Sequence, residues 1–117
     1  MHELSIAQAL IEELDRAARA EHASAVTRLT VAVGVLSGVE PEALKMAFPL
    51  AAEGTLSENA ELVVEIVTAE VRCPNCDETT EPLFPVMACV KCGSVDIEVI
   101  SGRELLIRSA ELNVPSA

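Results

Sequence analysis

Two closely spaced pairs of cysteines constrain this chain more than any other feature. They form the motifs CPNC at residues 73–76 and CVKC at residues 89–92, and 12 residues separate them. Two intervening residues let both thiolates of a pair face one ion, and four such sulfurs complete the tetrahedron of a structural zinc site. We therefore expect Zn(II) in a closed site with a structural role, bound by Cys73, Cys76, Cys89 and Cys92.

The same four thiolates would also accept iron in an electron carrier, and the sequence leaves this alternative open. Aromatic residues make up only 2% of the chain, so little aromatic shielding is available for an iron centre. Separate redox disulfides are a weaker interpretation, because each cysteine pair would have to act alone.

The charge of the chain restricts its partners. Its 117 residues include 19 acidic and 8 basic side chains, which give a formal net charge of −11. Binding to nucleic-acid phosphates or to an anionic membrane would require clustered Lys and Arg. His2 and Glu3 follow Met1 where a secretory leader would be basic and then apolar, and no apolar run has the length of a membrane span. We therefore expect a cytoplasmic protein that binds neither nucleic acid nor membrane, and a reducing compartment favours a metal site over disulfides.

Hydrophobic periodicity predicts two helices and several strands. Apolar residues recur every three or four positions from Leu4 to Ala18, which indicates an amphipathic helix that begins almost at residue 1. A second helix is expected to begin at Pro41, to be kinked or tightened at Pro49 and to end at Gly54.

Alternating apolar residues predict strands over residues 26–36, 61–71, 97–100 and 104–112. The last strand is expected to return to the first sheet. The cysteine segment is therefore predicted to be an insertion between strands and not a tail.

The amino terminus offers ligands for a second kind of metal site. The amine of Met1 and the amide and imidazole of His2 lie within chelating reach of one ion, and the amide of Glu3 could supply a fourth nitrogen. Such nitrogens in a plane suit Ni(II) or Cu(II) and not the tetrahedral ions. The residues alone leave two simpler interpretations open: His2 as a solvated side chain, and Glu3 as an acid that only complements the helix dipole.

Several motifs, taken together, resemble the HypA family of nickel metallochaperones, which act in the maturation of nickel-iron hydrogenase and, in some organisms, of urease. They are MHELSIA at residues 1–7, VGVLSGVEPEAL at residues 33–44, AEGT at residues 52–55 and the two cysteine pairs. The resemblance covers essentially the whole chain, in order. The chain departs from the family pattern at Pro49 and in having no histidine beside its cysteine pairs.

The resemblance implies an α+β fold in which two helices pack on a three-stranded sheet, with an inserted zinc-ribbon module. It places a nickel-binding α/β domain at residues 1–71 and 98–117, and a zinc-ribbon domain at residues 72–97.

The resemblance also implies a function, that of a nickel metallochaperone and not of an enzyme. Ni(II) would be bound by the amine of Met1, by His2 and by the backbone of Glu3, and then delivered to a hydrogenase, while the four cysteines hold structural Zn(II). The implied partners are a nickel-handling maturation GTPase, the hydrogenase large-subunit precursor and urease maturation factors, with the chain as a monomer or homodimer. The alternative is a zinc-ribbon interaction module in transcription or translation.

Overall fold

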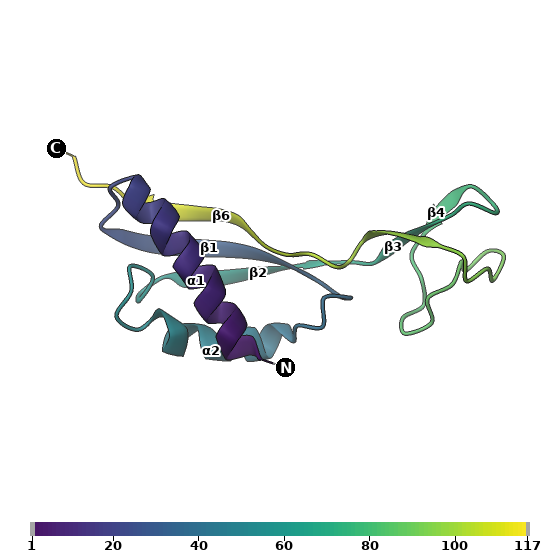
Figure 1. Ribbon diagram of the computed structural model, residues 1–117, viewed down its shortest axis with the longest axis horizontal. Helices are drawn as coiled ribbons and strands as arrows, with labels where there is room; N and C mark the ends of the chain where they lie inside the picture. Colours follow the sequence, from purple (N-terminus) through teal and green to yellow (C-terminus); the bar gives the residue numbers. More distant parts are fainter. Residues whose placement is uncertain (1, 117) are drawn as a thin grey trace.

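The computed structural model describes residues 2–116, and its strands form two separate sheets. In chain order the elements are α1 (Glu3–Ala20), β1 (Ala25–Gly34), α2 (Pro41–Ala52), β2 (Glu61–Val67), β3 (Glu70–Cys73), β4 (Glu78–Thr80), β5 (Glu98–Ser101) and β6 (Leu105–Asn113). The molecule is elongated, 59 × 29 × 16 Å, with both helices and one sheet at one end and the second sheet at the other (Figure 1). Within residues 2–116 no helix has the length and apolar character needed to cross a membrane.

The larger end is an α/β layer built around β1. This strand lies in the centre of the sheet, parallel to β2 and antiparallel to β6. One face of the sheet packs against both helices in a single, mostly aliphatic core. Its buried residues include Leu10, Leu14, Leu29, Val31, Leu44 and Phe48. The other face is exposed and carries Arg28, which binds Glu61 at 2.9 Å and Glu111 at 2.7 Å across the three strands. These observations confirm the predicted α+β fold with two helices on a three-stranded sheet.

Both helices begin near the residues that the sequence predicted. α1 buries Ala7, Leu10, Leu14 and Ala18 along one stripe, as its periodicity indicated. α2 has its first residue at Pro41, where the missing N–H costs nothing because that group would have no helical partner.

The second half of α2 continues through Pro49 to Ala52. Pro49 cannot donate the helical hydrogen bond that another residue would make there, and its ring crowds the carbonyl four residues earlier. Gly54 follows two residues beyond the helix in the left-handed conformation, with φ of 77°.

The single strand expected over residues 61–71 is wrong. β2 ends at Val67 and β3 begins at Glu70, and the two strands belong to different sheets. Thr68 and Ala69 form the crossing: Ala69 is buried, and the Thr68 carbonyl accepts a hydrogen bond from Ser101 Oγ at 2.9 Å. The buried positions change phase at this point: Leu62 and Val64 pack on the first core, whereas Ala69 and Val71 are buried after the crossing.

The two sheets meet at a narrow waist formed by small residues. A Cβ atom on Gly34 would lie 2.0 Å from the Gly102 carbonyl oxygen, and one on Gly102 would lie 2.9 Å from the Ala69 Cα. The Leu36 N–H donates to the Gly102 carbonyl at 2.6 Å, and the Gly34 N–H donates to the Glu104 carbonyl at 2.7 Å. The chain just after β1 is thereby fixed against the segment that leads into β6.

The second sheet has β3 at its centre, antiparallel to β4 and β5. β6 returns to the first sheet as predicted, so the cysteine segment is inserted between strands of that sheet. β5 pairs with β3, which places residues 98–101 in the second sheet together with residues 70–73.

Candidate metal centre

The four cysteine sulfurs converge at the outer end of the second sheet. Cys73 is the last residue of β3, Cys76 follows in the turn before β4, and Cys89 and Cys92 lie in the loop between β4 and β5. All four Sγ atoms lie within 4.8 Å of one another, with 3.6 Å between Cys73 and Cys92 and 3.5 Å between Cys76 and Cys89.

These distances fit a tetrahedral metal ion. Zn–S bonds of about 2.3 Å around a tetrahedral ion place the sulfurs about 3.8 Å apart. All four cysteines are free thiols and do not form disulfides with one another. The structure thus brings together the four residues that the spacing singled out, in a donor set suited to Zn(II).

Each cysteine pair forms the same turn. The N–H of Asp77 donates to the Cys73 carbonyl at 2.7 Å, and the N–H of Gly93 donates to the Cys89 carbonyl at 2.8 Å. Both donors are left-handed, with φ of 55° at Asp77 and 77° at Gly93. Sequence reasoning did not single out Asp77. Its position directly after the second cysteine of a pair was the available signal, because Asp tolerates this conformation better than most residues.

Burial and backbone dipoles differentiate the thiols. Cys73 and Cys89 are buried, Cys76 is half-buried and Cys92 is exposed. The backbone N–H groups of Cys92 and Lys91 lower the pKa of Cys89 to about 6. Interaction with Cys89 and burial raise the pKa of Cys76 to about 12. The backbone N–H groups thus favour the thiolate at Cys89, and because a metal ion binds thiolates, metal binding would release protons from the cluster.

The expected nickel ligands lie at the start of α1. His2 is the N-cap residue, its side chain makes no capping hydrogen bond, and it is exposed. Its carbonyl accepts the first helical hydrogen bond, from the Ile6 N–H at 3.0 Å. The imidazole therefore has no structural task in the helix. Met1, whose amine was expected to bind nickel, lies outside the described residues.

Glu3 has a side-chain contact that the sequence did not reveal. It is buried, and its Oε2 accepts a hydrogen bond at 3.2 Å from the backbone N–H of Glu40, the N-cap residue of α2. This hydrogen bond lowers the pKa of the Glu3 carboxyl. The side chain thereby joins the first turns of the two helices and leaves the Glu3 backbone as the part available to a metal. The signal for Glu40 was its place directly before Pro41, where a helix begins.

The fold and the four-thiolate site define a small metal-binding protein of two sheets. A family model described as hydrogenase/urease nickel incorporation, metallochaperone, hypA matches residues 1–112. The hydrogenase maturation factor HypA of Aquifex aeolicus is 43% identical over 114 residues, which are 97% of this chain and 99% of that protein. HypA of Chlorobium limicola is 44% identical over 109 residues, 93% of this chain and 94% of that protein.

The fold comparison agrees with the sequence comparison. The solution structure of the Ni metallochaperone HypA from Helicobacter pylori has a TM-score of 0.72 and 26% identity, over 98% of this chain and 100% of that chain. The chain belongs to the HypA family of hydrogenase maturation metallochaperones, as the motifs indicated.

Proposed function

We propose that this chain carries Ni(II) at its amino terminus and delivers it to the large-subunit precursor of a nickel-iron hydrogenase, acting as a carrier and not as an enzyme. The observation that carries the proposal is His2: an exposed imidazole at the second position of the sequence, with no capping role, in a member of a nickel-incorporation family. An exposed site at a chain end can transfer its ion by exchange of one ligand at a time.

The start of α1 favours a particular ligand set. The amides of the first helical turn have no intrahelical partner, and the helix dipole makes this end partly positive. A bare cation is therefore disfavoured there, whereas deprotonated backbone nitrogens offset the charge of a divalent ion. We assign as ligands the Met1 amine, the amide and imidazole of His2 and the amide of Glu3, a planar nitrogen set that suits Ni(II).

The cysteine centre supports a different role, structural binding of Zn(II). Within residues 70–101 only four residues are buried, and two of them are the cysteine ligands; the four are Val71, Cys73, Pro82 and Cys89. A segment with so small a core needs another source of stability, and a closed four-thiolate ion supplies it. We propose that residues 70–101 fold as a metal-dependent domain and that the α/β layer folds around its own core.

The proposed partners follow from the family. They are a nickel-handling maturation GTPase, the hydrogenase large-subunit precursor and urease maturation factors, in the cytoplasm. The net charge of −11 supports partners other than nucleic acid or membrane. The chain itself would act as a monomer or homodimer.

A nickel titration of untagged, zinc-loaded variants tests this function. His2→Ala should lose tight nickel binding and keep its zinc, because it removes the only imidazole near the terminus. His22→Asn is the matched control: His22 is also exposed, and Asn tolerates its left-handed backbone, with φ of 60°. Unchanged nickel affinity in His2→Ala, or an equal loss in both variants, would contradict the assignment.

A further inference from the structure

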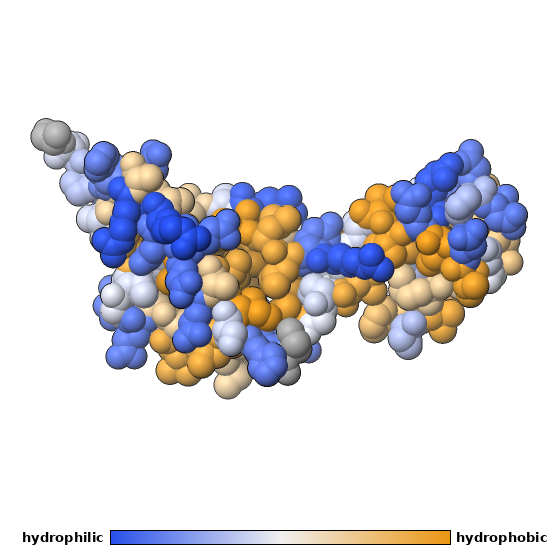
Figure 2. Space-filling view, in the orientation of Figure 1, coloured by the Kyte–Doolittle hydropathy of each residue, from blue (hydrophilic) through white to orange (hydrophobic). Residues whose placement is uncertain are grey.

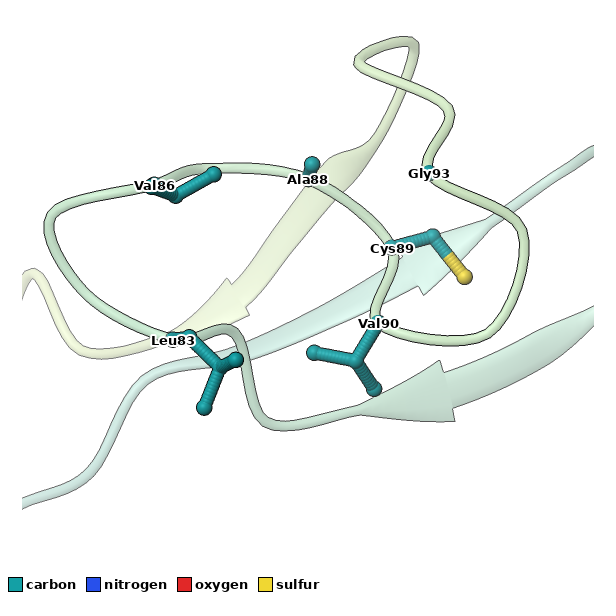
Figure 3. Close-up of a pocket in the computed structure, with 6 residues that line it drawn as sticks. All are labelled: Leu83, Val86, Ala88, Cys89, Val90 and Gly93. Carbon is teal, nitrogen blue, oxygen red and sulfur yellow. The ribbon is translucent and has the colours of Figure 1, made fainter.

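The loop that carries the second cysteine pair surrounds an apolar hollow. Its volume is about 350 Å³, and its lining is Leu83, Val86, Ala88, Cys89, Val90 and Gly93 (Figure 3). Leu83 is 75% exposed, Val86 62% and Val90 49%. Single exposed aliphatic residues are ordinary on a protein surface, but three around one hollow form a patch of the kind that binds partners. Figure 2 shows apolar surface over this part of the metal-binding end.

Two hydrogen-bonded backbone turns form the walls of the hollow. One wall is a turn in which the Val86 N–H donates to the Leu83 carbonyl at 2.9 Å. The other wall is the second cysteine turn, closed by the Cys89 N–H to the Ser94 carbonyl at 2.9 Å. The sulfur of Cys89 points away from the hollow and into the cysteine cluster (Figure 3). The lining is therefore shaped by two hydrogen-bonded turns, one of which carries a cysteine ligand.

The metal-binding end that contains the hollow carries an excess of negative charge. Residues 70–101 contain six carboxylates and two basic side chains, and both basic groups are already paired: Arg72 with Asp77, and Lys91 with Glu78 at 2.6 Å. Within the described chain, four carboxylates of this region have no ion-pair partner, namely Glu70, Glu81, Asp96 and Glu98. Four thiolates around one divalent ion would add a further net charge of −2.

We propose that this hollow binds a large aliphatic side chain from a partner protein, presented by a segment in which Lys or Arg flanks that side chain. The apolar lining selects the side chain, and the net negative charge of this end of the molecule favours basic flanking residues and speeds the encounter. The volume lies at the low end of the range for ligand pockets, so it admits one or two side chains. A second copy of this chain would bring the same negative charge and is disfavoured as the occupant. The proposal does not depend on where nickel binds.

Methyl NMR on the full, zinc-loaded chain tests this proposal, because shifts report even weak binding. The probes are short synthetic peptides with lysines on both sides of one Leu, Ile, Met or Val. At least one of them should shift the methyl signals of Leu83, Val86 and Val90. Replacement of its central residue by Ser, or of its lysines by Glu, should remove the shifts.

A pair of variants distinguishes binding in the hollow from nonspecific binding to exposed apolar residues. Leu83→Ser should weaken binding by roughly tenfold, the effect expected from loss of one buried aliphatic contact. Val95→Ser is the matched control, because Val95 is 80% exposed in the same loop and does not line the hollow. The proposal is overturned if no peptide shifts these methyls, if glutamate-flanked peptides bind as well, or if Val95→Ser weakens binding as much as Leu83→Ser.

Discussion

The α/β layer and the metal-binding end of this molecule are stabilised in different ways. The layer buries a continuous aliphatic core contributed by α1, α2 and β1. Residues 70–101 bury four residues, half of them cysteine ligands, over three short strands and their loops. In one region packing supplies the fold, and in the other the proposed Zn(II) ion would take the place of a core.

The two proposed metal sites differ in the same way as the regions that contain them. The cysteine centre has four converging ligands, two of them buried, and no spare position for exchange. His2 is exposed at the start of a helix and has no capping bond. Under the proposed function, the cysteine centre would retain Zn(II), whereas the amino-terminal site would transfer Ni(II).

Removal of one cysteine ligand should give the largest effect. Cys73→Ala opens the tetrahedron, so zinc content should fall close to zero and amide hydrogen exchange in residues 70–101 should approach that of an unfolded chain. Protection in α1 and β1 should persist, because their core lies outside this region.

A neighbour of the centre provides the control for this variant. Asn75 Nδ2 lies 3.8 Å from Cys92 Sγ, and Asn75→Ala should keep its zinc. Full zinc content in Cys73→Ala, or loss of protection in the α/β layer as well, would contradict the separation of the two regions.

A methyl group at the waist should have the next largest effect. Gly34→Ala would place its Cβ 2.0 Å from the Gly102 carbonyl oxygen, so the connected segments must shift at a cost of about 3 kcal/mol. Gly38→Ala separates this clash from backbone strain: φ is 81° there and the space around it is open, so only about 1 kcal/mol is expected. Chemical denaturation measures both, and equal losses would mean that the waist is not tightly packed.

Neutralising Glu3 should give the smallest effect, and one that depends on pH. The Glu40 N–H holds the Glu3 pKa below its usual value of 4.5, so the folded state binds this proton less readily than the unfolded chain. The resulting stabilisation is complete above pH 4.5 and is lost as pH falls through the lower folded pKa. Glu3→Gln should therefore lower the free energy of unfolding at pH 7 and approach the unmodified chain in acid. Glu12→Gln, on the exposed face of the same helix, controls for the change in charge, and an equal effect there would exclude a role for the Glu40 contact.

Local patterns in the sequence predicted most of the fold. α1, β1 and α2 were foreseen because the periodicity of apolar residues reports which side of an element is buried. The cysteine cluster was foreseen because the spacing within each pair determines a local turn, and one ion needs four such ligands. The change of sheet at Thr68 and Ala69 was not foreseen, because the unbroken apolar run at residues 62–64 hides the change of phase from Leu62 and Val64 to Ala69 and Val71.

The contact between the two helices at the start of α1 could not be predicted from the sequence, because it joins residues that are far apart in the chain. Glu3 and Glu40 are 37 positions apart, and neither residue type is unusual at its position. The close approach of Gly34 and Gly102 is likewise a product of the folded chain, because each glycine taken alone only indicates a turn or a break.

The most direct test of the central claim counts both metals in the native chain and in a copy whose terminal amine is acetylated. Both are loaded with zinc, titrated with nickel and challenged with a mild chelator. The account predicts one nickel with the absorbance of a planar nitrogen site in the native chain, none in the acetylated copy, and one retained zinc in each. Equal nickel uptake by the two, or loss of zinc together with nickel, would contradict the claim that one exposed site exchanges its ion while the other keeps it.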